Sequence, residues 1–416
     1  MSAGRRIAVT GLGAVSALGH SAAENWKAAC EPRCGIARQT LDPGADAPPE
    51  AQTLPLARVE PGFEAPVEAH LGRRVCGGLD RFAALALAAS FEALREAGLL
   101  DQPALRERAA VVLGHGFGGA ETLEKGYQRY FGAKQARPHP TTVPRAMLSA
   151  PVSAVAMSFG VRGPVFAVSS ACASSAHAIA QGAALIQMGA TDVAITGGSE
   201  AIVTPGSMRA WEALRALASE TCRPFSAGRD GMVMGEGAGV LVLEDLAHAQ
   251  RRGARVLGEL VGVGMTSDAH HLTQPSFEGP VGALSQASRA AGLASAERVL
   301  IAAHGTGTPL NDENEAAAIR EVFGARAPEH PVIATKSGHG HLIGGSAALQ
   351  AVIGLQSLAE QLAPPILNYL GPDPACALDL VLERARSVVC SHLLVNAFAF
   401  GGLNACLAFA RAPGER

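Results

Sequence analysis

The sequence predicts an α/β protein, and three observations support this fold class. Short apolar stretches lead repeatedly into glycine-rich loops, and helical stretches follow the loops. Nearly half of the 416 residues (48%) are apolar, so a large core is available. No apolar run in the sequence reaches the ~20 uncharged residues that a membrane span needs, so we expect no contact with a membrane.

The first elements can be justified one by one. Residues 7–9 are apolar and predict the first strand, and Ser21 and Glu24 form a capping box for the helix that follows. Residues 38–70 are rich in Pro, Asp and Glu, which indicates a surface excursion. Asp80 is placed to cap a helix that is Ala-rich around its whole circumference, and such a helix is expected to be buried.

The later strands follow the same pattern, because each short apolar run ends where a glycine, polar or charged residue begins a loop. The halves of the chain share this order of strand, glycine-rich turn and helix, which is compatible with an old duplication. We expect strands at residues 109–113, 164–168, 192–196, 240–243, 255–263, 298–303, 332–334 and 393–395.

Charge and cysteine usage exclude several classes of function. Only 17% of the residues are charged and the net charge is -3, so no basic excess points to nucleic acid. Eight cysteines are scattered without a CxxC pair, which is typical of a reduced, cytoplasmic protein rather than a disulfide framework. The stretch from Ile7 to Leu18 could resemble a signal peptide, but its glycines favour the strand.

Cys172 is the most informative residue. It lies between the apolar run 164–168 and a small-residue helical run, 173–188, so its thiol is expected at a strand-to-helix elbow. The helix N-terminus there favours a thiolate, with a pKa below the free value of ~8.5. All its neighbours are small, which leaves space for a thioester. A buried structural thiol is the alternative, and a Cys–His pair alone would also suit a protease or hydrolase.

Two histidine segments follow far downstream, HGTGT at 304–308 and KSGHGH at 336–341. Two neutral imidazoles beside a lysine can donate hydrogen bonds to one carbonyl oxygen and stabilise an enolate or oxyanion. His339 and His341 could instead bind a metal with His304, but no carboxylate triplet surrounds them and Lys336 is a poor neighbour for a cation. We therefore expect no metal.

The glycine-rich segment 114–119 fits the pattern GxGxxG after a strand, which is also found at dinucleotide-binding sites. No acidic residue follows ~20 positions on to bind a ribose. A buried turn is the better interpretation.

At these residues the chain resembles the elongating β-ketoacyl-acyl-carrier-protein synthases, in particular the ketosynthase II type and its polyketide relatives. The resemblance runs from Val9 to about residue 410. It rests on SACASS (170–175), RDG (229–231), GEGAG (235–239), SDAHH (267–271), HGTGTP (304–309), KSGHGHL (336–342) and NAFAFGGLN (396–404). It implies the thiolase fold, two similar halves stacked in a five-layered αβαβα sandwich. Residues 1–255 would carry the cysteine and residues 256–416 the two histidines.

The resemblance also implies a reaction. Cys172 would accept an acyl group from a carrier protein, and His304 and His341 would bind the malonyl thioester carbonyl, assist loss of CO₂ and stabilise the enolate. The backbone N–H groups of Cys172 and Phe400 would hold the oxyanion, and Phe400 would gate the site. Lys336 would pair with Glu315 and set the electrostatics around His304.

Other residues would bind the substrate and the carrier protein. Phe117 would shape the end of the acyl tunnel, and His339 would be structural. The loops that meet the substrate and its pantetheine arm would include Thr273, Thr306, Thr308, Phe398, Gly401 and Gly402. A basic rim for the acidic carrier protein would include Arg73, Arg74 and Arg215. The expected partners are an acyl carrier protein, whose phosphopantetheine carries the substrates, and a second subunit in a homodimer or in a heterodimer with another ketosynthase-like chain. No further cofactor is expected.

The chain departs from the family pattern at a few positions. Gln350 stands where a glutamate is usual, Phe117 replaces a smaller aliphatic residue, and Ser226 replaces an aspartate for no reason that we can give. Ala397 and Ala399 replace Ser and Gly in the gate loop. These differences favour a polyketide or other specialised pathway over housekeeping fatty-acid synthesis.

Three alternatives remain. A non-catalytic, chain-length-factor-like partner of a ketosynthase would lack the cysteine, which is present here. A thiolase that uses coenzyme A would have a second active cysteine in a CxG-like setting, which neither Cys390 nor Cys406 provides. A metal-dependent hydrolase would be built on His339 and His341.

Overall fold

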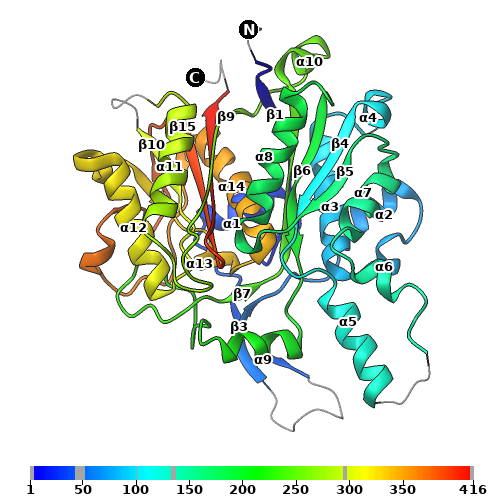
Figure 1. The fold of residues 1–416 in the computed structure, drawn as a ribbon, viewed down its shortest axis with the longest axis horizontal. Helices are drawn as coiled ribbons and strands as arrows, with labels where there is room; N and C mark the ends of the chain where they lie inside the picture. The colour runs from blue at the N-terminus through cyan, green and yellow to red at the C-terminus, as the bar shows by residue number, and fades with distance from the viewer. Residues whose placement is uncertain (1–3, 43–51, 101, 133–136, 294–297, 413–416) are drawn as a thin grey trace.

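One large sheet runs through both halves of the molecule (Figure 1). The computed structural model describes residues 4–42, 52–100, 102–132, 137–293 and 298–412. Within them, 11 strands pair edge to edge. From one edge to the other they are β13 (Asp379–Leu380), β11 (Pro331–Ile333), β10 (Val299–Ala302), β15 (His392–Ala399), β16 (Leu403–Arg411), β9 (Gly258–Ser267), β1 (Ile7–Val15), β8 (Gly237–Asp245), β6 (Val193–Glu200), β4 (Ala109–Gly114) and β5 (Val165–Val168).

The two halves of this sheet repeat one pairing scheme. In the first half, β1 pairs antiparallel with β8 and β8 with β6, then β6 pairs parallel with β4 and β4 with β5. In the second half, β9, β16, β15, β10 and β11 follow the same order of antiparallel and parallel pairs. The antiparallel pair β1–β9 joins the halves. The division expected at residue 255 falls in the loop before β9 and stays a prediction, because the sheet runs through it.

The helices form layers around and between the sheet halves. In Figure 1, α8 (Ser174–Gln187) and α14 (Ser346–Glu360) lie in the centre, and both contact strands of both halves. On the right, α3 (Arg81–Glu96) and α7 (Ala150–Phe159) cover the first half, and on the left α11 (Glu278–Ala290) and α12 (Pro309–Phe323) lie on the second. This gives the sequence of layers helix, sheet, helix, sheet, helix.

The remaining elements connect these layers or lie at their edges. The short helices are α1 (Ala22–Cys30), α2 (Ala65–Leu71), α4 (Ala104–Glu107), α5 (Ala120–Tyr127), α6 (Thr142–Ala146), α9 (Pro205–Ala213), α10 (Leu246–Arg251) and α13 (Lys336–His339). Single turns are η1 (Cys76–Gly78), η2 (Gln128–Gly132), η3 (Ala171–Ala173), η4 (Gly324–Glu329), η5 (Ile343–Gly345) and η6 (Pro374–Cys376). A small sheet contains β2 (Ala37–Leu41), β3 (Gln52–Ala57) and β7 (Met234–Gly235), and β12 (Leu362–Ala363) pairs with β14 (Arg386–Ser387).

Most of the predicted elements are confirmed. The first strand, the strand before Cys172 and the strands before both histidine segments are present. Asp80 caps α3 by accepting the N–H of Phe82 at 3.3 Å, and most of α3 is buried. Ser21 caps α1, but the Glu24 carboxylate binds the N–H of His20 at 2.6 Å, so the capping box is half formed.

Two expectations about elements were wrong. The segment 38–70 is not only a surface excursion, because it contains β2, β3 and α2. Pro, Asp and Glu concentrate at 43–51, outside the described residues, whereas Leu54 and Leu56 alternate as in a strand and Leu56 is buried. β9 begins at Gly258 rather than at residue 255. In the described part of the chain, no helix is long and apolar enough to cross a bilayer.

Candidate active site

Cys172 lies on a strained turn between β5 and α8. The residue before it, Ala171, has a left-handed backbone with φ of +49°, a conformation that costs free energy for a residue with a Cβ and that turns the next side chain out of the strand direction. The turn packs tightly against β4, since a Cβ on Gly114 would approach the carbonyl carbon of Ser174 to 2.2 Å. The sulfur is therefore held at a fixed point above the start of α8.

The expectation that Cys172 carries a thiolate with a lowered pKa was wrong for the unliganded protein. Burial raises the pKa of the Cys172 thiol to about 11, although the Lys336 ammonium and the backbone N–H groups of Phe400 and Cys172 lower it. The side chain is only 5% exposed, so the loss of hydration outweighs the charges and dipoles around it. The N–H groups of Cys172 and Phe400 nevertheless face the sulfur, as an oxyanion hole requires.

His341 contacts the sulfur directly. Its Nε2 lies 3.2 Å from Sγ of Cys172. Its Nδ1 accepts the N–H of Ile343 at 3.1 Å and lies 2.8 Å from Oγ of Ser346. An Nδ1 that accepts a backbone proton leaves the ring proton on Nε2. Burial and the charge of Lys336 keep the pKa of His341 far below its usual value, so the ring is neutral.

His304 also carries its ring proton on Nε2, but a different neighbour fixes this tautomer. The Lys336 Nζ lies 3.5 Å from Nδ1 of His304 and also donates to the His304 carbonyl at 2.5 Å. An ammonium has no lone pair, so Nδ1 accepts and the ring proton sits on Nε2. Burial and Lys336 again depress the pKa of the ring. The two imidazoles stand edge to face, with centroids 5.5 Å apart.

The expected pairing of Lys336 with Glu315 was also wrong. Within the described residues no ion pair joins them, and Nζ instead donates to the amide oxygen of Gln350 at 2.6 Å. Glu315 reaches from α12 to the loop after β10, where it accepts the N–H groups of His304 at 2.7 Å and Gly305 at 2.8 Å and the amide of Asn396 at 2.9 Å. The carboxylate is thus used to fix the His304 backbone.

The side chains of Cys172, His304 and His341 line one cavity of about 450 Å³. The Cys172 sulfur and one ring nitrogen of each histidine lie within 4.8 Å of one another. Every loop residue expected to meet the pantetheine arm or the acyl chain, except Phe117, lines the same cavity: Thr273, Thr306, Thr308, Phe398, Phe400, Gly401 and Gly402.

Comparison with known proteins identifies this arrangement. Residues 4–249 match the N-terminal domain of beta-ketoacyl synthases and residues 257–370 match the C-terminal domain. The chain belongs to the β-ketoacyl synthase family. It is 41% identical to nodulation protein E of Rhizobium meliloti (strain 1021), over 97% of this chain and 99% of that protein. It is 36% identical to 3-oxoacyl-[acyl-carrier-protein] synthase 2 of Staphylococcus aureus (strain COL), over 98% and 99%.

A solved structure gives the same result for the fold. The ishigamide ketosynthase/chain length factor superposes with a TM-score of 0.89 at 29% identity, covering 99% of this chain and 100% of that chain. The fold of this β-ketoacyl synthase is therefore the thiolase fold, as expected.

The loop expected to gate the site of this ketosynthase, residues 400–402, joins β15 to β16, and we keep the name gate loop for it. Gly401 and Gly402 have φ of +81° and +69°, and a Cβ on Gly402 would meet Cβ of Asp268 at 2.4 Å, so both positions need glycine. Phe400 stacks on Trp211 of α9, with centroids 6.3 Å apart. Trp211 in turn contacts Phe117 at 6.1 Å. We call Phe117, Trp211 and Phe400 the aromatic column.

Some residues expected at the site do not line the cavity at Cys172. Phe117 is 51% exposed and does not line the cavity of the ketosynthase, although the aromatic column connects it to Phe400. Of the three arginines, only Arg215 lines the cavity. Arg73 and Arg74 follow α2, which lies at the right of Figure 1, whereas α9, which leads to Arg215, lies at the bottom. His339 is buried and bonds Thr335 at 2.9 Å, consistent with a structural role.

Sequence reasoning missed Glu200, a fully buried carboxylate at the end of β6. It accepts the N–H groups of Gly116 at 2.7 Å, Phe117 at 3.2 Å and Gly344 at 3.1 Å. It therefore clamps the glycine-rich segment 114–119 to the loop after His341, and that segment forms a turn, as expected. Burial raises the pKa of Glu200 to about 7. An acidic residue at the end of the otherwise uncharged strand β6, two positions after its glycines, was the available signal.

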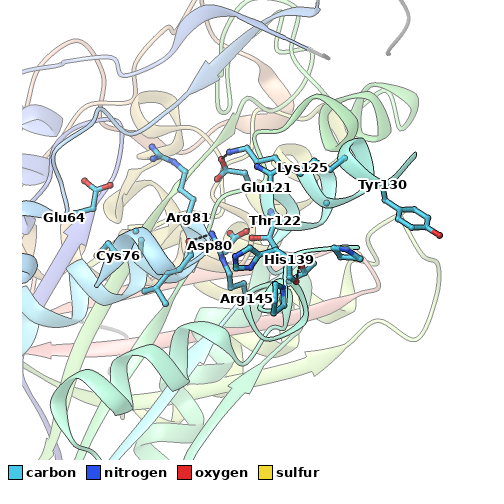
Figure 2. A pocket seen from close by; sticks show the side chains of 18 of the residues that line it. Glu64, Cys76, Asp80, Arg81, Glu121, Thr122, Lys125, Tyr130, His139 and Arg145 are labelled. Atoms are coloured by element: carbon cyan, nitrogen blue, oxygen red, sulfur yellow. Dashed lines mark hydrogen bonds and ion pairs between the residues drawn. The ribbon is translucent and has the colours of Figure 1, made fainter. Parts of the chain in front are cut away.

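The larger cavity of this ketosynthase, about 660 Å³, lies away from the chemistry (Figure 2). It lies between α3 and the α5–α6 region, and Figure 2 shows Arg81 on one side of Asp80 and His139 and Arg145 on the other. Its lining contains none of the residues expected to act in catalysis. By volume it would rank above the cavity at Cys172.

Proposed function

We propose that the protein is a β-ketoacyl-acyl-carrier-protein synthase, which condenses malonyl-acyl-carrier protein with an acyl group held on Cys172. One observation carries the proposal. The Cys172 sulfur, two Nε2–H groups and two backbone N–H groups converge on one cavity. A Claisen condensation needs this combination of an acyl-holding thiol and hydrogen-bond donors for two separate oxyanions.

The first half-reaction transfers the acyl group to Cys172. The sulfur attacks the thioester carbonyl, and the N–H groups of Cys172 and Phe400 stabilise the oxyanion that forms. The bond to the pantetheine sulfur then breaks, and the thiol proton of Cys172 leaves with the pantetheine thiol. His341 lies at 3.2 Å and donates toward the sulfur, which stabilises negative charge there as the proton departs.

The second half-reaction forms the carbon–carbon bond. The malonyl thioester carbonyl accepts Nε2–H of His304 and His341, and the C–CO₂ bond breaks to give CO₂ and an enolate. The enolate carbon attacks the acyl carbonyl on Cys172, the carbon–sulfur bond breaks and the thiolate takes a proton from solvent. Each hydrogen bond to the enolate oxygen is worth about 3 kcal/mol of barrier, and no metal is needed because decarboxylation supplies the carbanion.

A metal centre remains the main chemical competitor, since Cys172, His304 and His341 offer one sulfur and two nitrogen atoms in close proximity. The Lys336 ammonium, 3.5 Å from the His304 ring, opposes a divalent cation there. The condensing function is favoured for that reason.

The partners are part of the proposal. The pantetheine arm of an acyl carrier protein would enter past Arg215, which is exposed and lines the cavity. The second subunit would be another copy or a ketosynthase-like chain, as in the ketosynthase/chain length factor. We place the reaction in a polyketide or other specialised pathway, because Phe117, Gln350, Ala397 and Ala399 depart from the family pattern. We place it in the cytoplasm, because all eight cysteines are free. Fatty-acid synthesis is the second candidate, supported by the relative from Staphylococcus aureus.

The test uses acyl-carrier proteins loaded with short and medium chains. Intact mass should show an acyl adduct on the wild-type protein and none on Cys172→Ala. Addition of malonyl-carrier protein should then release a β-ketoacyl product. Condensation by Cys172→Ala, or loss of activity on metal chelation, would refute the assignment.

A further inference from the structure

Lys336 is a buried cation whose close partners are all neutral. Its side chain is 1% exposed, and Nζ contacts the carbonyl oxygen of His304, the amide oxygen of Gln350 and Nδ1 of His304. Among the described residues no carboxylate lies within ion-pair distance of Nζ. A buried ammonium without a counterion is costly to fold, so the arrangement calls for an explanation.

Gln350 holds this ammonium through a fixed amide. Its side chain is 1% exposed and lies on α14, behind the end of β10. Its Nε2 donates to the carbonyl of Ala303 at 2.7 Å while its Oε1 accepts from Lys336 at 2.6 Å. The two contacts require a donor on one side and an acceptor on the other, which an amide supplies and a carboxylate does not.

Several charged and titratable groups surround Lys336, but among the described residues none neutralises its ammonium by direct contact. Glu315 and Asp312 of α12 attract the ammonium, but their carboxylates already bind backbone N–H groups. The charge of Lys336 also acts to lower the pKa of two thiols and three imidazoles. These are Cys172, Cys222, His304, His339 and His341. Glu200 acts on Cys172 in the opposite sense.

We propose that Gln350, as an uncharged partner of the Lys336 ammonium, leaves the charge beside His304 unneutralised, so that this charge stabilises a thiolate on Cys172 and keeps the His304 proton on Nε2. The role given to His304 rests on the proposed function. The effect on the sulfur does not, and it can be measured without any carrier protein.

The experiment compares the rate of alkylation of Cys172 by iodoacetamide from pH 6 to 7.5 in the full-length protein, with the modified peptide quantified by mass. This range lies below the pKa of about 8 to which burial lowers Lys336, so the ammonium is present throughout. Gln350→Glu adds a negative charge beside Nζ. The alkylation profile should move about one pH unit to higher pH, a tenfold slower reaction at a given pH. Gln350→Met removes both amide contacts without adding charge and is the matched control, for which the rate should stay within about twofold of wild type.

Lys336→Met provides a second variant that does not depend on Gln350→Glu being folded. It removes the charge altogether and should slow alkylation by at least as much as Gln350→Glu. Unchanged rates in either charge variant, or equal slowing in Gln350→Met, would overturn the proposal. A wild-type protein with the expected charge dependence but without condensing activity would refute the proposed function and leave the electrostatic role of Gln350 standing.

Discussion

At the scale of single residues, the two imidazoles reach the same protonation state by different means. His341 is fixed by the backbone N–H of Ile343, whereas His304 is fixed by the ammonium of Lys336. Only His341 contacts the sulfur. The two rings should therefore contribute unequally to the two half-reactions.

The variant His304→Ala tests this difference. We expect acylation of Cys172 to remain within a few-fold of wild type, because His341 and the oxyanion N–H groups are intact. Decarboxylation of malonyl-carrier protein should fall ~10²–10³-fold, because one enolate donor is lost. Intact mass measures the first step and CO₂ release the second. Equal losses in both steps would contradict separate roles.

At the scale of elements, loops and helices place the residues around the sulfur. The aromatic column links α9 to the gate loop, so that the position of Phe400 depends on Trp211 and, through it, on the loop that carries Phe117.

Removal of the ring of Trp211 or of Phe117 should therefore alter the acyl pocket. We expect Trp211→Ala to shift the products toward longer chains, and Phe117→Ala to do so less strongly, because it lies one ring further from Phe400. Phe131→Ala, at an exposed aromatic residue of η2, is the control. Chain lengths are measured by mass spectrometry of the released products. A column that serves only as packing would lower stability and leave the product distribution unchanged.

The Glu200 clamp makes a prediction about pH. A carboxyl pKa raised from 4.5 to about 7 means that the folded protein binds this proton more tightly than the unfolded chain. The stabilisation is full below the unfolded pKa and is lost as the pH rises through about 7. Urea unfolding of wild type and Glu200→Gln should show their difference in free energy of unfolding falling by roughly 3 kcal/mol from pH 4 to 8. A difference that grows with pH would contradict the burial argument.

At the scale of the whole molecule, the arginines proposed to contact a carrier protein lie on different parts of the surface. Arg215 lines the catalytic cavity, whereas Arg73 and Arg74 follow α2 on another part of the surface. Arg215→Glu should raise the KM for acyl-carrier protein several-fold at low salt and change kcat little, because charge at a rim acts on association. Arg73→Glu makes the same change of charge at the distant segment and serves as the comparison. A larger effect of Arg73→Glu would move the docking surface to α2.

The sequence was sufficient for whatever depends on local pattern. Cys172 could be placed between a strand and a helix because small residues follow an apolar run, and glycine residues marked the gate loop. The raised pKa of Cys172 could not be predicted, because it comes from burial by segments far apart in the chain. The partner of Lys336 was missed for the same reason, since Gln350 and Glu315 can only be ranked once α14 and α12 are in place.

The pairing of β1 with β9 has a consequence for how such a catalyst can be divided. A cut in the loop after Arg251 would leave the mercapto group on one fragment and both rings on the other. Neither piece could form or break a carbon bond alone, although within the large sheet each would lose only the β1–β9 pairing. Activity therefore depends on the joint between the two halves, and only reassembly of the two fragments could restore it.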